Sequence, residues 1–311
     1  RRPPAGGTQA AMTELVVELL GGLRVLGADG REIRISSRKA QAVLACLALR
    51  PGTSIARDRL ASLLWDDSDP ELGRASLRQA LAALRRALPG AAAQTLLGDA
   101  TSIALDAAHA SSDVQRFRDR LRDGSPHALA EAAERYAGEL LPGFDARSAA
   151  FDAWIDEHRR ALRREWVQAL QRYAVQCVAS GDLDGATEAL SRLVSVEPAN
   201  EAAQRDLMDV YARRGRYTEA LRQYRACTEA LRRDLDVGPE PATEALHRDI
   251  LRRRRAVDAS AAEPGLAAPA LSETAPPITT LKEVVVLVAR IGVAPEAADD
   301  DPESVRARWS A

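Results

Sequence analysis

The chain contains little lysine and few aromatic residues. Of its 43 basic residues only Lys39 and Lys282 are lysines, and Phe, Trp and Tyr make up 4% of the 311 residues. So few aromatic side chains disfavour a β-sandwich and, with abundant Ala and Leu, favour close packing between helices. The net charge of −2 excludes a global basic field, so any contact with nucleic acid must come from a local patch.

Cysteine and histidine are also scarce. Cys46, Cys177 and Cys227 lie far apart in apolar helical patterns, which predicts buried free thiols in a reducing cytosol rather than a disulfide framework. The four histidines have no ligand spacing, so we expect no metal site and no cofactor. The sequence contains no P-loop, no paired metal carboxylates and no nucleophile–His–Asp arrangement, and we therefore expect no catalytic residues and no enzyme.

No apolar run approaches the ~20 residues that a membrane-spanning helix needs, and the N-terminus has no signal-peptide core. We therefore expect a cytoplasmic protein with no membrane partner. The length predicts two domains and part of a third. The fold class expected is mainly α with a small antiparallel β component.

A helix is predicted over residues 69–88. Asp69 suits the N-cap and Pro70 the first helical position, and the next helix-breaking pair is Pro89-Gly90. Its apolar stripe repeats every three or four residues, at Leu77, Leu81, Leu84 and Leu88. At ~100° per residue the arginines fall on the other sides. Such a helix is either a recognition helix for the DNA major groove or an ordinary amphipathic helix with a solvated charged face.

The elements around this helix follow in a particular order. We expect strands at 15–20, 23–26 and 32–35, helices at 38–49 and 57–65, a short β link at 53–55, and a hairpin at 94–97 and 102–105. Sheet, helix, helix, long helix and hairpin is the order of a winged helix-turn-helix. The expected domain spans residues 13–107.

Three motifs in this segment, SSRKAQAVLACL, TSIARDRLASLLW and RASLRQALAALRRAL, resemble those of the OmpR-type DNA-binding domain of the SARP/AfsR family of bacterial transcriptional activators. Two features depart from the family. Alanines stand at 75, 82 and 83 where members usually carry polar groups, and the hairpin turn is the acidic Gly98-Asp99-Ala100-Thr101, which would repel phosphate. The DNA-binding residues expected are Arg74, Arg78, Gln79, Arg85 and Arg86, with Arg38 and Lys39 as phosphate contacts or merely solvated charges.

Helical spacing resumes after residue 113. We expect helices at 113–123, 126–140 and 149–180, and then a repeat of 34 residues, the tetratricopeptide period. Gly181 and Gly215 are related by this offset, as are Ala186 and Ala220. A helix at 241–254 would cap the array. Segments such as GRYTEALRQYRACTEALRRDL resemble the bacterial transcriptional activator domain of the same family, here expected at 108–255.

The resemblance implies an activator that binds direct repeats in promoter DNA as a homodimer and recruits RNA polymerase and its sigma factor. Outside it we expect a disordered leader at 1–12, a linker at 256–280 and the start of a truncated third domain at 281–311. EVVVLVARI (283–291) resembles the first strand of class III nucleotidyl cyclases, but Arg290 stands at the metal-binding aspartate and cannot ligate Mg²⁺. The alternative function is a protein-interaction scaffold or signalling regulator with a degenerate winged helix, fused to a cyclase-like domain.

Overall fold

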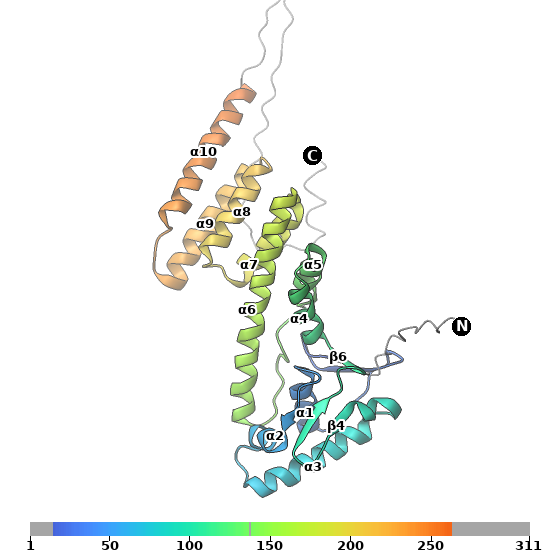
Figure 1. Ribbon diagram of the computed structural model, residues 1–311. Helices are drawn as coiled ribbons and strands as arrows, with labels where there is room; N and C mark the ends of the chain where they lie inside the picture. The colour runs from blue at the N-terminus through green and yellow to red at the C-terminus, as the bar shows by residue number, and fades with distance from the viewer. Residues whose placement is uncertain (1–14, 137, 263–311) are drawn as a thin grey trace, which may run out of the picture. The chain divides into compact units, whose positions relative to one another are not determined.

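The computed structural model describes residues 15–136 and 138–262 (Figure 1). The leader predicted at 1–12, the linker beyond residue 262 and the third-domain segment predicted at 281–311 lie outside these residues.

The predicted fold class is confirmed, because helices dominate and the strands are short. The strands are β1 (Leu15–Glu18), β2 (Arg24–Gly27), β3 (Ile55–Ala56), β4 (Leu96–Gly98), β5 (Ser102–Leu105) and β6 (Ala110–Ser112). The helices are α1 (Arg38–Ala48), α2 (Arg57–Leu64), α3 (Pro70–Ala87), the 3-10 helix η1 (Gly90–Thr95), α4 (Asp113–Asp123), α5 (Pro126–Arg135), α6 (Ala149–Ser180), α7 (Leu183–Val196), α8 (Glu201–Arg213), α9 (Tyr217–Leu235) and α10 (Pro241–Ala262).

The first sheet has the strand order β2-β1-β6. β1 pairs antiparallel with β2, Val17 opposite Val25, as the sequence pattern predicted. The third strand predicted at 32–35 is wrong, since Glu32 makes only an isolated bridge to Leu26. The other side of β1 is taken instead by β6, which runs parallel to it. A parallel strand that lies almost a hundred residues away in the sequence cannot be predicted from the alternation of apolar and polar residues within β1.

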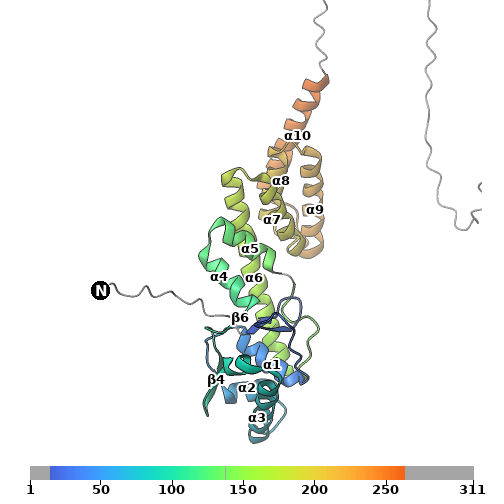
Figure 2. The same ribbon diagram turned by 90° about the vertical axis from the view of Figure 1, so that its right-hand side faces the viewer.

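The second sheet has the order β3-β5-β4, with all pairs antiparallel. β4 and β5 form the predicted hairpin, in which Leu96 pairs with Leu105. Gly98 is required at its turn, because a Cβ there would lie 2.8 Å from the carbonyl oxygen of Ser102. Helices α1 and α2 pack beside this sheet and α3 packs on both helices, which completes the winged helix-turn-helix (Figure 2).

One hydrophobic core runs from the winged helix into the helices that follow. It contains side chains of β1, α1 and α3 together with Phe117 of α4 and Phe151 and Leu162 of α6, all almost fully buried. Asp113, the first residue of α4, accepts hydrogen bonds from the backbone N–H groups of Leu19 and Leu20, at 2.9 and 2.8 Å. The core therefore continues across the domain boundary predicted between residues 107 and 108.

Helix α5 ends earlier than predicted, at Arg135 rather than residue 140. The backbone after it pairs with the residues that follow β1: Gly21 N donates to Glu139 O at 2.9 Å and Leu141 N to Leu19 O at 2.8 Å. Backbone groups held in this way cannot also continue a helix. The helical spacing of residues 136–140 was therefore overridden by a tertiary contact.

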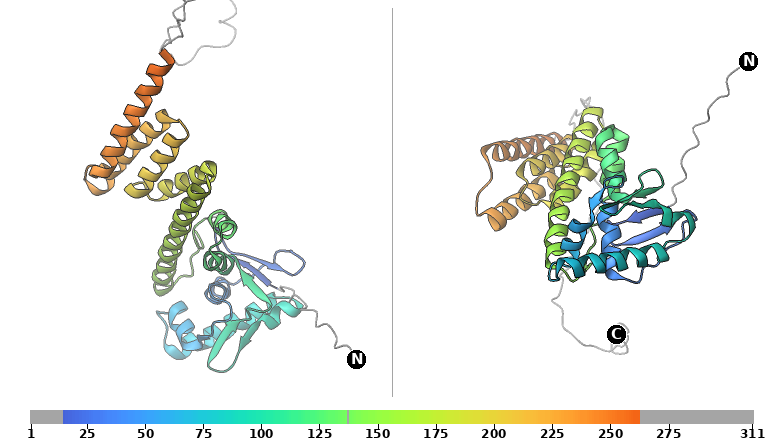
Figure 3. Two further views of the ribbon diagram at one scale, coloured as in Figure 1. Left: turned by 45° about the horizontal axis from the view of Figure 1, so that its top comes forward. Right: turned by 60° about the horizontal axis from the view of Figure 1, so that its bottom comes forward.

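The predicted helical array is present. The carboxyl half of α6 packs on α7, α8 packs on α9, and α10 covers α8 and α9 (Figure 3). Gly181 and Gly215 follow their helices in the left-handed region, with φ of 81° and 70°, where glycine avoids a Cβ penalty. Ala186 and Ala220, which share the 34-residue offset, are fully buried where two helices approach. Small residues at these positions allow the close packing of the repeat.

Helix α10 is longer than predicted and ends at Ala262. The linker predicted from residue 256 is therefore helical over its first seven residues. The segment from Arg252 to Ala262 contains neither Gly nor Pro, and its Arg and Ala residues have high helix propensity. Composition alone placed the end of this helix too early.

Candidate nucleic-acid interface

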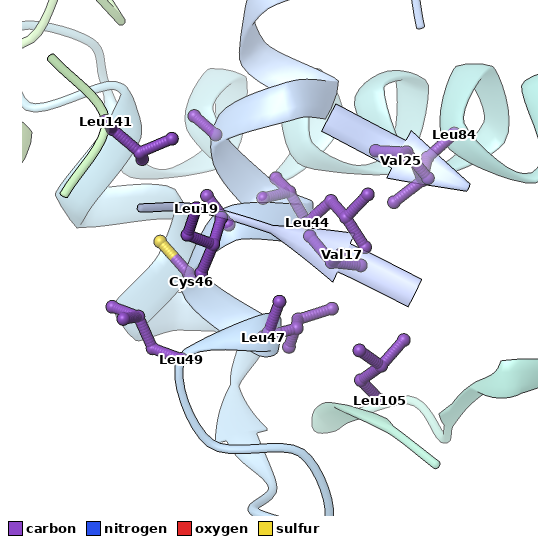
Figure 4. Packing of buried hydrophobic residues seen from close by; sticks show 14 of the residues in the cluster. Val17, Leu19, Val25, Leu44, Cys46, Leu47, Leu49, Leu84, Leu105 and Leu141 are labelled. Atoms are coloured by element: carbon purple, nitrogen blue, oxygen red, sulfur yellow. The ribbon is translucent and has the colours of Figure 1, made fainter. Parts of the chain in front are cut away.

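The leucines of helix α3 pack it against the hydrophobic core of the winged helix. Asp69 caps it by accepting a hydrogen bond from Glu71 N at 2.9 Å, and Pro70 opens its first turn. The four leucines predicted to face inward are buried in the core, with exposed fractions of 0–3%: Leu77, Leu81, Leu84 and Leu88. They pack the helix against α1 and α2 (Figure 4). Gly73 and Ala80 are buried beside them, and the arginines of the helix are exposed to solvent.

Five predicted DNA-binding residues lie on this exposed surface: Arg74, Arg78, Gln79, Arg85 and Arg86. Within residues 15–136 and 138–262, no side-chain hydrogen bond or ion pair engages Arg78, Gln79 or Arg85. Arg86 Nε donates to Ala82 O on its own helix at 3.3 Å. Three guanidinium groups and one amide are thus presented on one helix. Groups of these types bind phosphates and base edges.

Arg74 differs from its neighbours because an acidic residue of α2 holds it. Its Nε donates to Asp58 Oδ1 at 2.7 Å, and Nη2 lies 3.4 Å from Oδ2. The hydrogen bond and charge of Asp58 raise the pKa of Arg74 above its ordinary value. The guanidinium is therefore directed toward α2 and away from the outer face of α3.

Asp58→Asn is expected to strengthen binding to duplex DNA at low salt, because it frees Arg74 and removes a negative charge. One added phosphate contact steepens the slope of log K against log salt concentration by about 0.9. Fluorescence anisotropy with a labelled duplex over a salt series measures this slope. Asp58→Asn combined with Arg74→Ala is the control and should lose the gain; an unchanged slope in the single variant would show that Arg74 does not reach DNA.

Arg38 and Lys39 have different environments although they are adjacent. Arg38 is exposed, with its guanidinium carbon 5.3 Å from the centre of the Phe144 ring. Lys39 is half-buried, and its Nζ donates to the carbonyl oxygens of Leu64 and Arg147. Burial lowers the pKa of Lys39, against the raising effect of Asp66 and other carboxylates nearby. The ammonium ties α1 to the end of α2, so the predicted phosphate contact by Lys39 is not supported by its position.

The turn of the hairpin is organised by its one acidic residue. Asp99 Oδ1 accepts hydrogen bonds from Thr101 N at 2.7 Å, Thr101 Oγ1 at 2.8 Å and Ser102 N at 2.8 Å. These bonds, that from Thr101 N first, lower the pKa of Asp99 to about 2. The carboxylate therefore shapes the wing, and it places a negative charge at the tip where a phosphate contact would need a positive one.

The wing turn is expected to loosen in acid. Because the pKa of Asp99 is lower in the folded chain, its ionised form stabilises the turn above the ordinary pKa of 3.8, and this contribution is lost as pH falls toward 2. Carboxyl chemical shifts followed by NMR should give an Asp99 midpoint near 2, and the Thr101 amide should shift with it. In Asp99→Asn the Thr101 amide should not titrate. A midpoint near 3.8 would contradict the bonding seen at this turn.

Two features near α3 were missed by the sequence reasoning. The turn between α2 and α3 is fixed to the start of α6: Asp66 Oδ2 accepts from Ala150 N at 2.9 Å, and Ser148 Oγ donates to Leu63 O at 2.7 Å. No local pattern signals these contacts. The second feature is Leu72, which is 64% exposed in the first turn of α3. Its spacing to residues 75, 79 and 82 would have shown that Leu72 lies on the outer side of the helix.

Residues 15–136 and 138–262 include no group of three or more His, Cys, Asp or Glu side chains placed to hold a metal ion. None of the helices in these ranges combines the length and apolar character needed to cross a bilayer. The three cysteines are buried and unpaired in disulfides.

Comparison with known proteins relates this architecture to a class of regulators. Residues 105–251 match the family model of the bacterial transcriptional activator domain. The chain is 28% identical to Regulatory protein AfsR of Streptomyces coelicolor over 81% of this chain, but that match covers only 26% of AfsR. It is 27% identical to Transcriptional regulatory protein MoaR1 of Mycobacterium tuberculosis, over 73% of this chain and 76% of MoaR1.

A solved structure, Mycobacterium tuberculosis EmbR in complex with low affinity phosphopeptide, has the same architecture. The TM-score is 0.59 at 25% identity, over 80% of this chain and 69% of that one. The chain therefore combines a winged helix with a helical array, and it is similar to known transcriptional regulators. The middle of the chain, residues 105–251, thus matches the bacterial transcriptional activator domain, and over most of its length the chain is similar to SARP-type transcriptional regulators.

Proposed function

We propose that this chain is a transcriptional activator that reads promoter DNA through α3. Arg78, Gln79, Arg85 and Arg86 contact base edges and phosphates in the major groove, and Arg38 contacts the backbone. Two protomers bind direct repeats as a homodimer, and the activator domain contacts RNA polymerase and its sigma factor. The DNA-binding segment is 13–107 and the activator segment 108–255. Such a protein acts in the bacterial cytoplasm, where the DNA is.

The observation that carries the proposal is the two-sided construction of α3. One side is anchored by buried leucines, and the other presents Arg78, Gln79 and Arg85 without partners in the part of the chain that is described. On a solvated helix face, opposite charges at i, i+4 stabilise the helix and like charges there destabilise it. Here the last two turns carry Arg85 and Arg86 and no acidic residue. The surplus of positive charge is therefore local to the proposed contact, in a chain whose net charge is −2.

Activation would proceed by recruitment rather than by chemistry. Favourable contacts between the activator domain and polymerase strengthen the binding of polymerase to the promoter. By the same coupling, bound polymerase strengthens the binding of the activator to its DNA site. Ser148 and Asp66 provide a hydrogen-bonded connection between the segment that precedes the DNA-reading helix and the start of α6, the first helix of the array. This connection supports a geometry in which one protein contacts both polymerase and DNA.

Selection of bound sequences from a pool of random duplexes tests the proposal. The full chain should enrich one motif arranged as a direct repeat, and footprinting should show two protomers on it. Its affinity should fall steeply with salt, because each phosphate contact releases counterions. Enrichment of no motif, with affinity independent of salt, would reject DNA reading.

The scaffold alternative has a specific observation in its favour. Ala75 and Ala82 lie on the outer side of α3, and an alanine discriminates little beyond a thymine methyl group. A scaffold with a degenerate winged helix should show weak, sequence-independent DNA binding and keep its protein contacts. The selection and the salt series therefore separate the two functions.

A further inference from the structure

The outer side of α3 carries a second regular stripe. Residues 72, 75, 79, 82 and 86 are spaced by three, four, three and four, which places them on one line opposite the buried leucines. The stripe consists of Leu72, Ala75, Gln79, Ala82 and Arg86, all exposed except the half-buried Ala75. It changes character along the helix, since its amino-terminal half is apolar and its carboxyl-terminal end is polar.

Leu72 is the largest apolar group on this line. Its side chain is 64% exposed and belongs to none of the buried clusters. The start of the helix does not require it, because Asp69 and Pro70 already provide the cap and the first turn. A single exposed leucine is ordinary on a protein surface. What sets Leu72 apart is its place in the first turn of α3, since recognition helices contact base edges with their amino-terminal residues.

We propose that Leu72, together with Ala75, contacts the 5-methyl groups of thymine in the operator. This inference rests on the proposed function. The major groove displays one apolar group, the thymine methyl; cytosine instead presents an amino donor, and the purines present polar edges. A leucine placed over a polar edge would displace its water without replacing the hydrogen bonds. The half-site therefore carries thymine where it faces the first turn of α3, and Gln79 and Arg86 read the positions that follow.

The test removes only the methyl group. The operator obtained by selection is resynthesised with each thymine replaced in turn by deoxyuridine, and affinities are measured by fluorescence anisotropy. Loss of the contacted methyl should weaken binding about three- to fivefold, the effect of exposing one buried methyl-sized group. Leu72→Ala should weaken binding to the thymine duplex by a similar or larger factor and should no longer distinguish it from the duplex with deoxyuridine at the position that faces Leu72.

Two controls keep the result specific. Val175 on α6 is similarly exposed, at 66%, so Val175→Ala should bind like the unaltered chain and keep the methyl preference. Thermal unfolding of Leu72→Ala should be unchanged, because alanine favours the helix and no buried contact is lost. Equal affinity of the unaltered chain for every deoxyuridine duplex would overturn the inference and leave the proposed function standing.

The remaining outcomes are equally decisive. If Leu72→Ala retained both affinity and methyl preference, Leu72 would not read the base. If it retained binding but lost promoter activation, the leucine would contact a protein partner, and the inference would be wrong. Selection of no motif by the unaltered chain would remove the proposed function and this inference together.

Discussion

Arg78→Ala is expected to weaken binding to the selected operator by about 1–3 kcal/mol, if the guanidinium makes a bidentate contact with guanine. The side chain is exposed in the middle of α3, one residue before Gln79, and needs to break no contact with the described protein to reach a base. The loss should be largest at one base pair of the half-site. Competition binding against operators mutated at each position measures this.

The matched control for Arg78 is Arg164. It is an exposed arginine on α6, far along the chain from the winged helix, and Arg164→Ala should leave operator affinity unchanged. Random DNA provides the second comparison. An equal loss on operator and random duplexes would show that Arg78 only touches phosphate, and base reading would then fall to Gln79 and Arg86.

Leu84→Ala is expected to lower the free energy of unfolding by about 2–5 kcal/mol, the usual cost of emptying a leucine site in a packed core. Leu84 is fully buried, and it reaches from α3 toward the strand that carries Val25 (Figure 4). Its removal leaves a cavity beneath the helix that carries the arginines. Urea unfolding gives the change in stability, and the midpoint should shift without a change in slope.

An exposed leucine serves as the control for Leu84. Leu235, at the end of α9, is 58% exposed, and Leu235→Ala should change stability by less than about 0.5 kcal/mol. The affinity of Leu84→Ala for the operator should also fall, because α3 is packed on the core in a smaller fraction of the molecules. A loss of stability below about 1 kcal/mol would contradict the view that leucine packing holds α3 in place.

Local patterns predicted much of the architecture. The structure places α3 at Pro70–Ala87, α4 at Asp113–Asp123 and α6 at Ala149–Ser180, within a residue or two of the ranges expected. These helices have clear caps and apolar stripes, which are properties of neighbouring residues. The 34-residue period was equally readable, because the buried alanines and the turn glycines recur at fixed offsets.

The candidate site was predicted only in part. Which residues of α3 face outward followed from helix geometry, and the exposure of Arg78, Gln79 and Arg85 agrees with it. Their contact with DNA stays a prediction. The partners of Arg74 and Lys39 could not be read, because Asp58, Leu64 and Arg147 are brought to them by the packing of separate elements.

The sequence by itself determined where α3 begins and ends, which of its sides is apolar, and that a repeated helical hairpin follows; these depend on contacts between residues a few positions apart. Tertiary structure alone decided that β6 pairs with β1, that residues 139–141 leave the helix, and that Asp58 holds Arg74. The physical reason is that a hydrogen bond to a distant segment uses the backbone and side-chain groups that a local helix or the solvent would otherwise satisfy. The spacing of apolar residues does not reveal that such a partner exists. Where such a bond is available in the folded chain, it prevails over the periodic pattern.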